Sequence, residues 1–151
     1  MGGVRVGSVV IDCNDFDRMF AFWRDALGYV PRDEPEDDWV VLHDPSGSNV
    51  NVSLQVVPEP RVGKNRLHLD LYAEDRDAEI ERILGLGATI HPRTPEPDED
   101  FVVLADPEGN LFCVIQRTAV PAFAADASGG LGFCERGRID LGIGPSGEDR
   151  S

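Results

Sequence analysis

The sequence predicts an α+β fold in which two tandem βαβββ modules form a curved, incompletely closed eight-stranded sheet around a cavity. Three observations lead to this prediction. The chain repeats itself at an offset of about 60 residues, each repeat contains one amphipathic helix pattern, and the strand patterns alternate between apolar and polar residues. A helix on one side of each module leaves the other side of its sheet free to curve around a small molecule.

The internal repeat is carried by four pairs of segments that occur in the same order. The pairs are residues 8–15 with 68–75, 26–28 with 85–87, 31–32 with 92–93, and 39–47 with 101–109. The offset drifts slightly from pair to pair, as insertions in loops would produce. We therefore divide residues 1–118 into module one (4–57) and module two (66–118).

Module one is predicted to contain one helix and four strands. The strands span residues 4–13, 29–32, 39–43 and 50–57, and the helix spans residues 16–27. Asp15 suits the N-cap of this helix, and Gly28 suits its end. Phe16, Met19, Phe20, Trp23 and Leu27 recur at helical spacing, so we assign them to the core rather than to a binding site.

Module two repeats the same order of elements. Its strands are predicted at residues 66–73, 89–92, 101–105 and 111–116, and its helix at 76–84, with Asp75 as the N-cap and Gly87 as the stop. In the first of these strands, Leu67, Leu69 and Leu71 form the apolar face. His68 lies on the opposite, polar face, and it is the first candidate for a functional residue.

Polar side chains gather on the strand faces that point away from the predicted helices. We predict that His68 and Asp70 are catalytic. The predicted ligand-binding residues are Ser8, Asp12, Asn51, Ser53, Gln55, Tyr72 and Cys113. A concave sheet lined by a few converging polar groups is the usual form of a small-molecule site. His43 ends a predicted strand just before Asp44-Pro45, and His91 precedes Pro92, so we assign both to strand ends or loops.

The charge, hydropathy and cysteine content of the chain limit the kinds of molecule that it is expected to bind and the compartment in which it is expected to lie. The chain has 28 acidic and 14 basic residues, a net charge of −14, which argues against nucleic acid and anionic membranes and favours a cationic ligand. We find no apolar run near the roughly 20 residues that span a bilayer and no secretory signal, so we expect a cytoplasmic protein. Three scattered cysteines do not make a disulfide framework, and we expect Cys13 and Cys113 to be buried.

Two turn motifs carry a family resemblance. Asp44-Pro45-Ser46-Gly47 and Asp106-Pro107-Glu108-Gly109-Asn110 each follow an apolar strand, and residues 66–71 read Arg-Leu-His-Leu-Asp-Leu. With the βαβββ repeats, they resemble the vicinal oxygen chelate superfamily of glyoxalases, extradiol dioxygenases, fosfomycin-resistance transferases and bleomycin-resistance proteins. The similarity is greatest to its glyoxalase-like domain branch and covers residues 4–118.

The resemblance implies a set of metal-ligand positions shared between the two modules. These positions hold Ser8, Gln55, His68 and Cys113, where relatives usually carry histidine, glutamine or glutamate. We therefore assign His68 and Gln55 as the metal ligands and expect either no metal or a weakly held divalent ion.

Asp12 and Asp70 lie on the same predicted strand faces as the expected ligand positions Ser8 and His68, four and two residues further along the chain. Two interpretations of this pair stay open. The aspartates either tie the inner strands together by hydrogen bonds across the pseudo-twofold axis, or they join His68 in a displaced cation site.

The resemblance implies a small-molecule-binding protein of the glyoxalase or bleomycin-resistance type, with a degraded metal site and the ligand held between the modules. The alternative is a metal-dependent glyoxalase-like lyase, isomerase or dioxygenase that uses His68. An accessory domain with a vestigial pocket is a third interpretation. Related modules pair as homodimers, and we expect the same here.

Residues 119–151 are rich in Gly, Ala and Pro, and the resemblance does not reach them. Within them, residues 138–143 alternate like a strand. This C-terminal extension is either disordered or adds that strand to a sheet edge.

Overall fold

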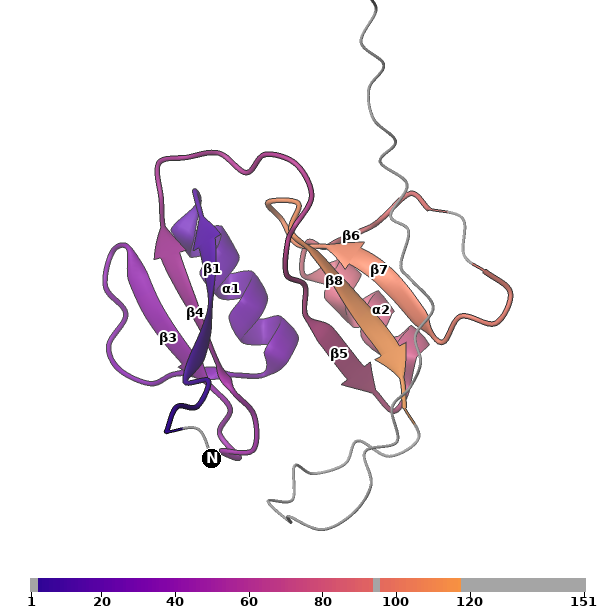
Figure 1. Ribbon diagram of the computed structural model, residues 1–151, viewed down its shortest axis with the longest axis horizontal. Coiled ribbons are helices and arrows are strands. Elements are labelled where there is room, and N and C mark those ends of the chain that lie inside the picture. The colour runs from indigo at the N-terminus through magenta and orange to yellow at the C-terminus, as the bar shows by residue number, and fades with distance from the viewer. Residues whose placement is uncertain (1–2, 94–95, 118–151) are drawn as a thin grey trace, which may run out of the picture.

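The computed structural model describes residues 3–93 and 96–117, and within them eight strands form two four-stranded sheets (Figure 1). The predicted α+β class and the two tandem modules are confirmed. Each module has its own sheet, and the sheets are not closed. The predicted C-terminal extension lies outside the described residues.

Module one has the strand order β1-β4-β3-β2. Its elements are β1 (Ser8–Cys13), α1 (Phe16–Leu27), β2 (Val30–Pro31), β3 (Trp39–His43) and β4 (Asn51–Val56). The edge strand β1 runs parallel to β4, while the other pairs are antiparallel. The helix connects the edge strand β1 to β2 at the other edge of the sheet.

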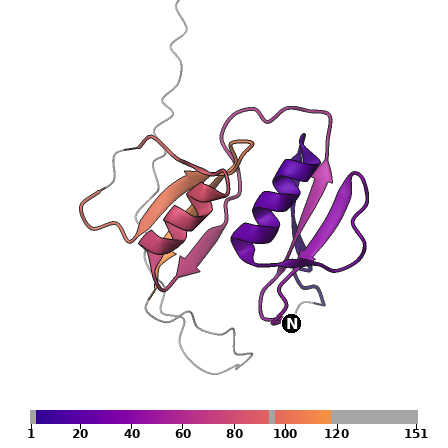
Figure 2. The same ribbon diagram turned by 180° about the vertical axis from the view of Figure 1, so that it is seen from behind.

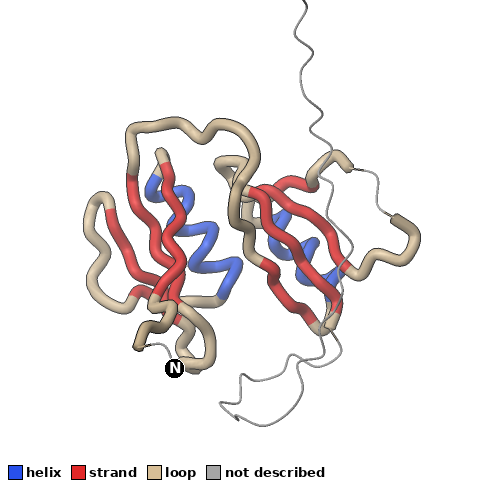
Figure 3. Tube along the Cα trace, in the orientation of Figure 1, coloured by secondary structure: helices blue, strands red, loops and turns tan. Residues whose placement is uncertain are grey.

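Module two repeats this topology in the order β5-β8-β7-β6. Its elements are β5 (Asp70–Ala73), α2 (Arg76–Gly85), β6 (Thr89–Ile90), β7 (Phe101–Ala105) and β8 (Leu111–Gln116). The strands β1 and β5 face each other in the middle of the molecule. The linker between the modules, residues 57–69, crosses from β4 to β5 above them (Figure 3).

Both helices cover the same side of the molecule, as the view from behind shows (Figure 2). The predicted N-caps are confirmed, because Asp15 accepts a hydrogen bond from the Arg18 amide at 3.2 Å and Asp75 accepts one from the Ala78 amide at 3.0 Å. Gly28 ends α1 with a φ of 65°, which an L residue rarely adopts.

The strands that open the two modules are shorter than predicted. Residues 4–7 lie outside β1 because its only neighbour, β4, begins at Asn51, opposite Ser8. In module two, the Asn65 side chain donates to the Leu111 carbonyl at 2.9 Å and accepts from the Leu111 amide at 3.2 Å. The Asn65 side chain thus occupies the backbone groups of Leu111 with which a longer β5 would pair. Leu67, which was predicted to lie on the apolar face of this strand, is 82 % exposed.

The two modules share one apolar core. Phe22 and Trp23 of α1 pack against Phe112 of β8, with ring centroids 6.2 and 5.3 Å apart. The Trp23 Nε1–H donates to Asp106 Oδ2 at 3.1 Å, and both residues are buried. Arg82 of α2 adds a hydrogen bond between the modules, because its guanidinium donates to the carbonyl of Ala26 in α1 at 2.8 Å. These contacts fix the modules against each other.

The two Asp-Pro turns are built around their aspartates. Asp44 accepts from the Ser46 amide at 2.8 Å, from the Ser46 hydroxyl at 2.7 Å and from the Asn49 side chain at 2.7 Å. These hydrogen bonds to the ionised carboxylate lower the pKa of Asp44 to about 2. Asp106 accepts from the Glu108 and Asn110 amides in the same way.

In the part of the chain that the structure describes, neither helix has the length and apolar character needed to cross a bilayer.

Substituting Trp23→Phe should destabilise the protein by about 1–3 kcal/mol, because it leaves a buried Asp106 oxygen with one donor fewer. The free energy of unfolding from urea titration measures this loss. Trp39→Phe is the matched control, because Trp39 is half-buried in β3 and has no counterpart to the Asp106 bond among the described contacts. Equal losses for the two variants would contradict the assignment.

The lowered pKa of Asp44 predicts a pH-dependent stability. A carboxyl group whose pKa is lower in the folded than in the unfolded chain stabilises the fold above its unfolded pKa of about 3.9. That contribution is lost as the pH falls toward about 2. The melting temperature of Asp44→Asn should therefore lie below that of the wild type at pH 6, and the two should converge between pH 4 and 2. The exposed Asp37→Asn should show no such convergence.

Candidate functional site

The candidate site lies on the face of the module two sheet that points away from α2. Asp70 of β5 lies opposite Cys113 of β8, and Cys113 lies opposite Val103 of β7. Because residues directly opposite each other share a face, these three side chains form one row across the sheet. Val103, Cys113 and Ile115 make a small buried cluster there, separate from the main core.

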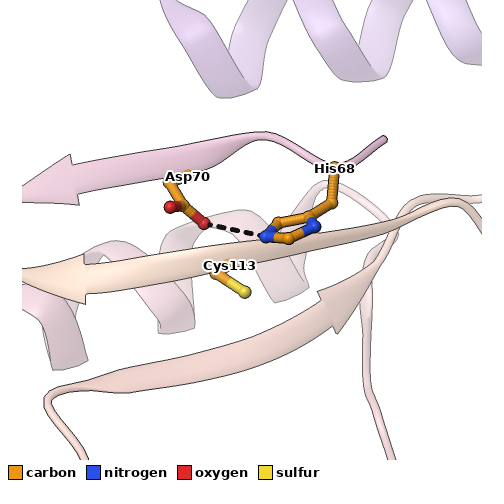
Figure 4. A group of neighbouring side chains, drawn as sticks. All are labelled: His68, Asp70 and Cys113. Atoms are coloured by element: carbon orange, nitrogen blue, oxygen red, sulfur yellow. Dashed lines mark ion pairs between the residues drawn. The ribbon is translucent and has the colours of Figure 1, made fainter. Parts of the chain in front are cut away.

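His68, Asp70 and Cys113 come together on this face (Figure 4). His68 Nε2 lies 3.3 Å from Asp70 Oδ1, and one ligating atom from each of the three residues falls within 4.8 Å of the others. The side chains of His68 and Asp70 are 40 % and 27 % exposed, whereas Cys113 is 3 % exposed. A partly exposed imidazole and carboxylate thus lie close to a buried thiol.

A cavity of about 660 Å³ lies between the two modules. One wall is β1, and the opposite wall is formed by the linker and the residues around the second Asp-Pro turn. Its polar lining consists of Asp12, Asn14, Glu59, Arg61, Lys64, Asn65, His68, Glu108 and Asn110. The rest of the wall is largely apolar, with Ile11, Trp23, Leu69 and Phe112 among its residues.

The two features meet at His68. A smaller cavity of about 20 Å³ is lined by Lys64, His68 and Cys113, and Lys64 and His68 also line the large cavity. The His68/Asp70/Cys113 group therefore lies at the margin of the inter-module cavity. A molecule held there can reach the imidazole of His68.

Hydrogen bonds of Glu108 and Asn14 fix the part of the cavity wall where the second Asp-Pro turn meets β1. The Glu108 carboxylate accepts from the Asn14 amide at 2.8 Å and from the Asp15 amide at 3.3 Å. The Asn14 side chain in turn donates to the Val57 and Glu59 carbonyls at 2.9 and 3.0 Å. One chain of contacts thus joins module two, β1 and the start of the linker.

Cys13 forms part of the cavity wall and is the repeat counterpart of Ala73. Burial, followed by the charges of Glu108 and Asp12, raises the pKa of the Cys13 thiol to about 11. The thiol therefore stays protonated at neutral pH. Neither of the two described cysteines forms a disulfide, and both are buried, as the sequence predicted.

The predicted site residues of module one fall into two sets. Asp12 lines the inter-module cavity together with His68. Hydrogen bonds join the other set within the module one sheet. The Ser8 and Ser53 hydroxyls lie 2.6 Å apart, and Ser8 Oγ donates to the Asn51 carbonyl at 3.3 Å. Gln55 is exposed on β4, and neither cavity includes it. A ligand role for Ser8, Asn51, Ser53 and Gln55 stays a prediction.

Tyr72 lies one pleat beyond Asp70 on the same face of β5. The Arg117 guanidinium carbon lies 5.2 Å from its ring centroid. In the same region Arg93 forms an ion pair with Glu99 and stacks on Phe101 at 5.2 Å. Two cationic side chains thus flank the row that contains the His68/Asp70/Cys113 group.

The three candidate metal ligands that the structure brings together, His68, Asp70 and Cys113, all belong to module two. Asp70 meets His68 and Cys113, whereas Asp12 is not a member of this group. Imidazole, carboxylate and thiolate are all ligands that divalent ions accept, so the residues present fit a metal ion.

Reasoning from the sequence missed the residues that the linker and the turn contribute. Lys64, Asn65, Glu108 and Asn110 line the large cavity, and they come from segments without strand or helix periodicity. His91, which the sequence placed at a strand end or in a loop, directly follows β6. Its amide donates to the Val103 carbonyl, which places His91 opposite Val103, and its buried Nδ1 has no hydrogen-bond partner among the described residues.

Comparisons with known proteins agree with this fold. The sequence pattern of the "Glyoxalase-like domain" family matches residues 8–115. A glyoxalase/bleomycin resistance protein/dioxygenase family enzyme from Burkholderia phytofirmans PsJN superimposes with a TM-score of 0.62 at 18 % identity, covering 75 % of this chain and 98 % of that one. No curated protein matches the chain in sequence.

Two further solved structures are similar. A point mutant of the fosfomycin resistance protein FosX from Listeria monocytogenes, complexed with Mn(II) and 1S,2S-dihydroxypropylphosphonic acid, has a TM-score of 0.61 at 16 % identity. The match covers 76 % of this chain and 90 % of that one. A glyoxalase I mutant from Zea mays has a TM-score of 0.58 at 25 % identity, covering 78 % of this chain and 46 % of that one. The chain therefore belongs to the glyoxalase-like domain family of the vicinal oxygen chelate superfamily.

Proposed function

We propose that this protein binds a small organic molecule in the cavity between its two modules. The observation that carries the proposal is the cavity itself, whose volume is about 660 Å³. Ligand pockets usually measure about 300–1,000 Å³ and combine apolar walls with a few placed polar groups. The cavity between β1 and the linker has both properties.

The lining indicates what kind of molecule fits. The apolar wall, which includes Ile11, Leu69 and Phe112, suits an aliphatic or aromatic body. Asp12 and Glu59 offer carboxylates to a cationic group, as in the bleomycin-resistance type that the sequence suggested. Lys64 and His68 offer donors to an oxygen-bearing group at the other end.

The comparisons support a small-molecule function of this kind. The similar structures include a family enzyme described with glyoxalases, bleomycin resistance proteins and dioxygenases, and a fosfomycin resistance protein complexed with a small phosphonate. At these identities they support the scaffold, and the ligand of this chain is proposed from its own cavity.

A second candidate is a metal-dependent glyoxalase-like lyase, isomerase or dioxygenase that uses His68. The observation that favours it is the convergence of His68, Asp70 and Cys113 at the margin of the cavity. This candidate requires a bound divalent ion, whereas simple ligand binding does not. Turnover of a probe that depends on an added divalent ion therefore separates the two.

Isothermal titration calorimetry with bleomycin, fosfomycin and catechol tests the proposal. These probes present a cationic, an anionic and a vicinal-oxygen group. We expect a saturable heat from at least one of them. Val10→Trp should weaken that binding by at least about 10-fold, or 1.4 kcal/mol, because the indole fills the cavity that Val10 lines.

The control is Val30→Trp. Val10 and Val30 are 46 % and 41 % exposed, so both positions accept a larger side chain, but Val30 does not line the cavity. It should bind like the wild type. Flat heats with all three probes, or unchanged affinity in Val10→Trp, would count against the proposal.

A further inference from the structure

We propose that His68, Asp70 and Cys113 form a complete three-ligand metal site within module two, and that its thiolate selects Zn²⁺ and Co²⁺ over Mg²⁺, Ca²⁺ and Mn²⁺. The inference goes beyond the proposed function, because it holds whether or not an organic molecule binds between the modules. It also differs from the arrangement that the resemblance implies, in which ligands such as Gln55 come from module one as well.

The spacing of the donor atoms fits a small divalent ion. In a tetrahedral site with metal–ligand bonds of about 2.0–2.3 Å, two ligand atoms lie about 3.3–3.8 Å apart. His68 Nε2 and Asp70 Oδ1 are already 3.3 Å apart, and all three donors fall within 4.8 Å of one another. The remaining separations, at most 4.8 Å, need to shorten by about 1 Å or less when an ion binds.

The backbone that carries the three residues is fixed by hydrogen bonds. Asp70 and Cys113 lie opposite each other on the paired strands β5 and β8, and the Cys113 amide donates to the Leu69 carbonyl at 2.9 Å. Just before His68, the Asn65 side chain bonds both backbone groups of Leu111. The ligands therefore need little ordering when an ion binds.

The environment of the group leaves room for a fourth ligand. Cys113 is buried beneath the site, while His68 and Asp70 are partly exposed and His68 lines both cavities. Three protein ligands with an open position are typical of catalytic zinc sites. A bound ion would polarise an oxygen that occupies the open position.

The donor types determine which ions are preferred. Thiolate is a soft ligand that favours zinc and other borderline ions, whereas Mg²⁺, Ca²⁺ and Mn²⁺ prefer sites made of oxygen atoms alone. A single carboxylate beside imidazole and thiolate is a poor site for those hard ions. Cys113 is therefore the residue that sets the selectivity.

Titration of the purified, metal-free full-length protein with Co²⁺ tests the inference. Coordination by Cys113 should produce a near-ultraviolet sulfur-to-cobalt charge-transfer band that saturates at one ion per chain. Zn²⁺ should abolish the band by displacement, and excess Mg²⁺ or Ca²⁺ should leave it unchanged. Failure of this test leaves calorimetry with organic probes as a separate test of the proposed function.

Matched variants identify the ligands. His68→Gln and Asp70→Asn should weaken Co²⁺ binding by more than about 100-fold, beyond the roughly 10–100-fold cost of losing an outer-shell partner. Cys113→Ser should remove the charge-transfer band. Asp12→Asn and His43→Gln are controls, because Asp12 lies in β1 and His43 ends β3, both in module one and outside the three-residue group. Both should bind Co²⁺ like the wild type.

Three results would overturn the inference: no charge-transfer band in the wild type, a band that persists in Cys113→Ser, or equal losses in Asp12→Asn and Asp70→Asn. Because Cys113 is buried, Cys113→Ser is first compared with the wild type by circular dichroism. If that variant does not fold, His68→Gln decides the matter, since the partly exposed His68 side chain tolerates replacement.

Discussion

The hydrogen bond from Trp23 to Asp106 is the contact on which the arrangement of the two modules depends. It joins a helix of module one to the Asp-Pro turn of module two inside a core that also contains Phe22 and Phe112. Groups of its own turn already donate to the buried Asp106 carboxylate, and Trp23 adds a donor that reaches it only when the modules are docked as observed. The docked pair then places β1 beside the linker and leaves the inter-module cavity between them.

Strand alternation determines what this cavity offers a ligand. Residues of β5 and β8 that lie opposite each other share a face, so Asp70 and Cys113 meet without any contribution from a loop. His68 precedes β5, where the Asn65 side chain replaces strand pairing at Leu111. The histidine consequently reaches both the row on the sheet and the larger cavity.

Much of this could be predicted from the sequence, because the repeat and the alternation are local patterns. Helix α1, the strands β3, β7 and β8, both N-caps and the shared face of His68, Asp70 and Cys113 follow from spacing alone. The roles of Asn65 and Glu108 do not, since each makes contacts across more than 40 residues of chain. That Asp12 is not part of the group follows from the repeat itself, because the offset of 60 aligns Asp12 with Tyr72 and Asp70 with Val10.

The central claim is that His68 lies where a ligand in the inter-module cavity meets the donor group of module two. The chain has three histidines, so their ring signals can be followed individually by nuclear magnetic resonance during titration with the probe that binds most tightly. The account predicts a saturable shift of the His68 ring signals, with those of His43 unchanged. A ligand that shifts His43 and leaves His68 unaffected would contradict it.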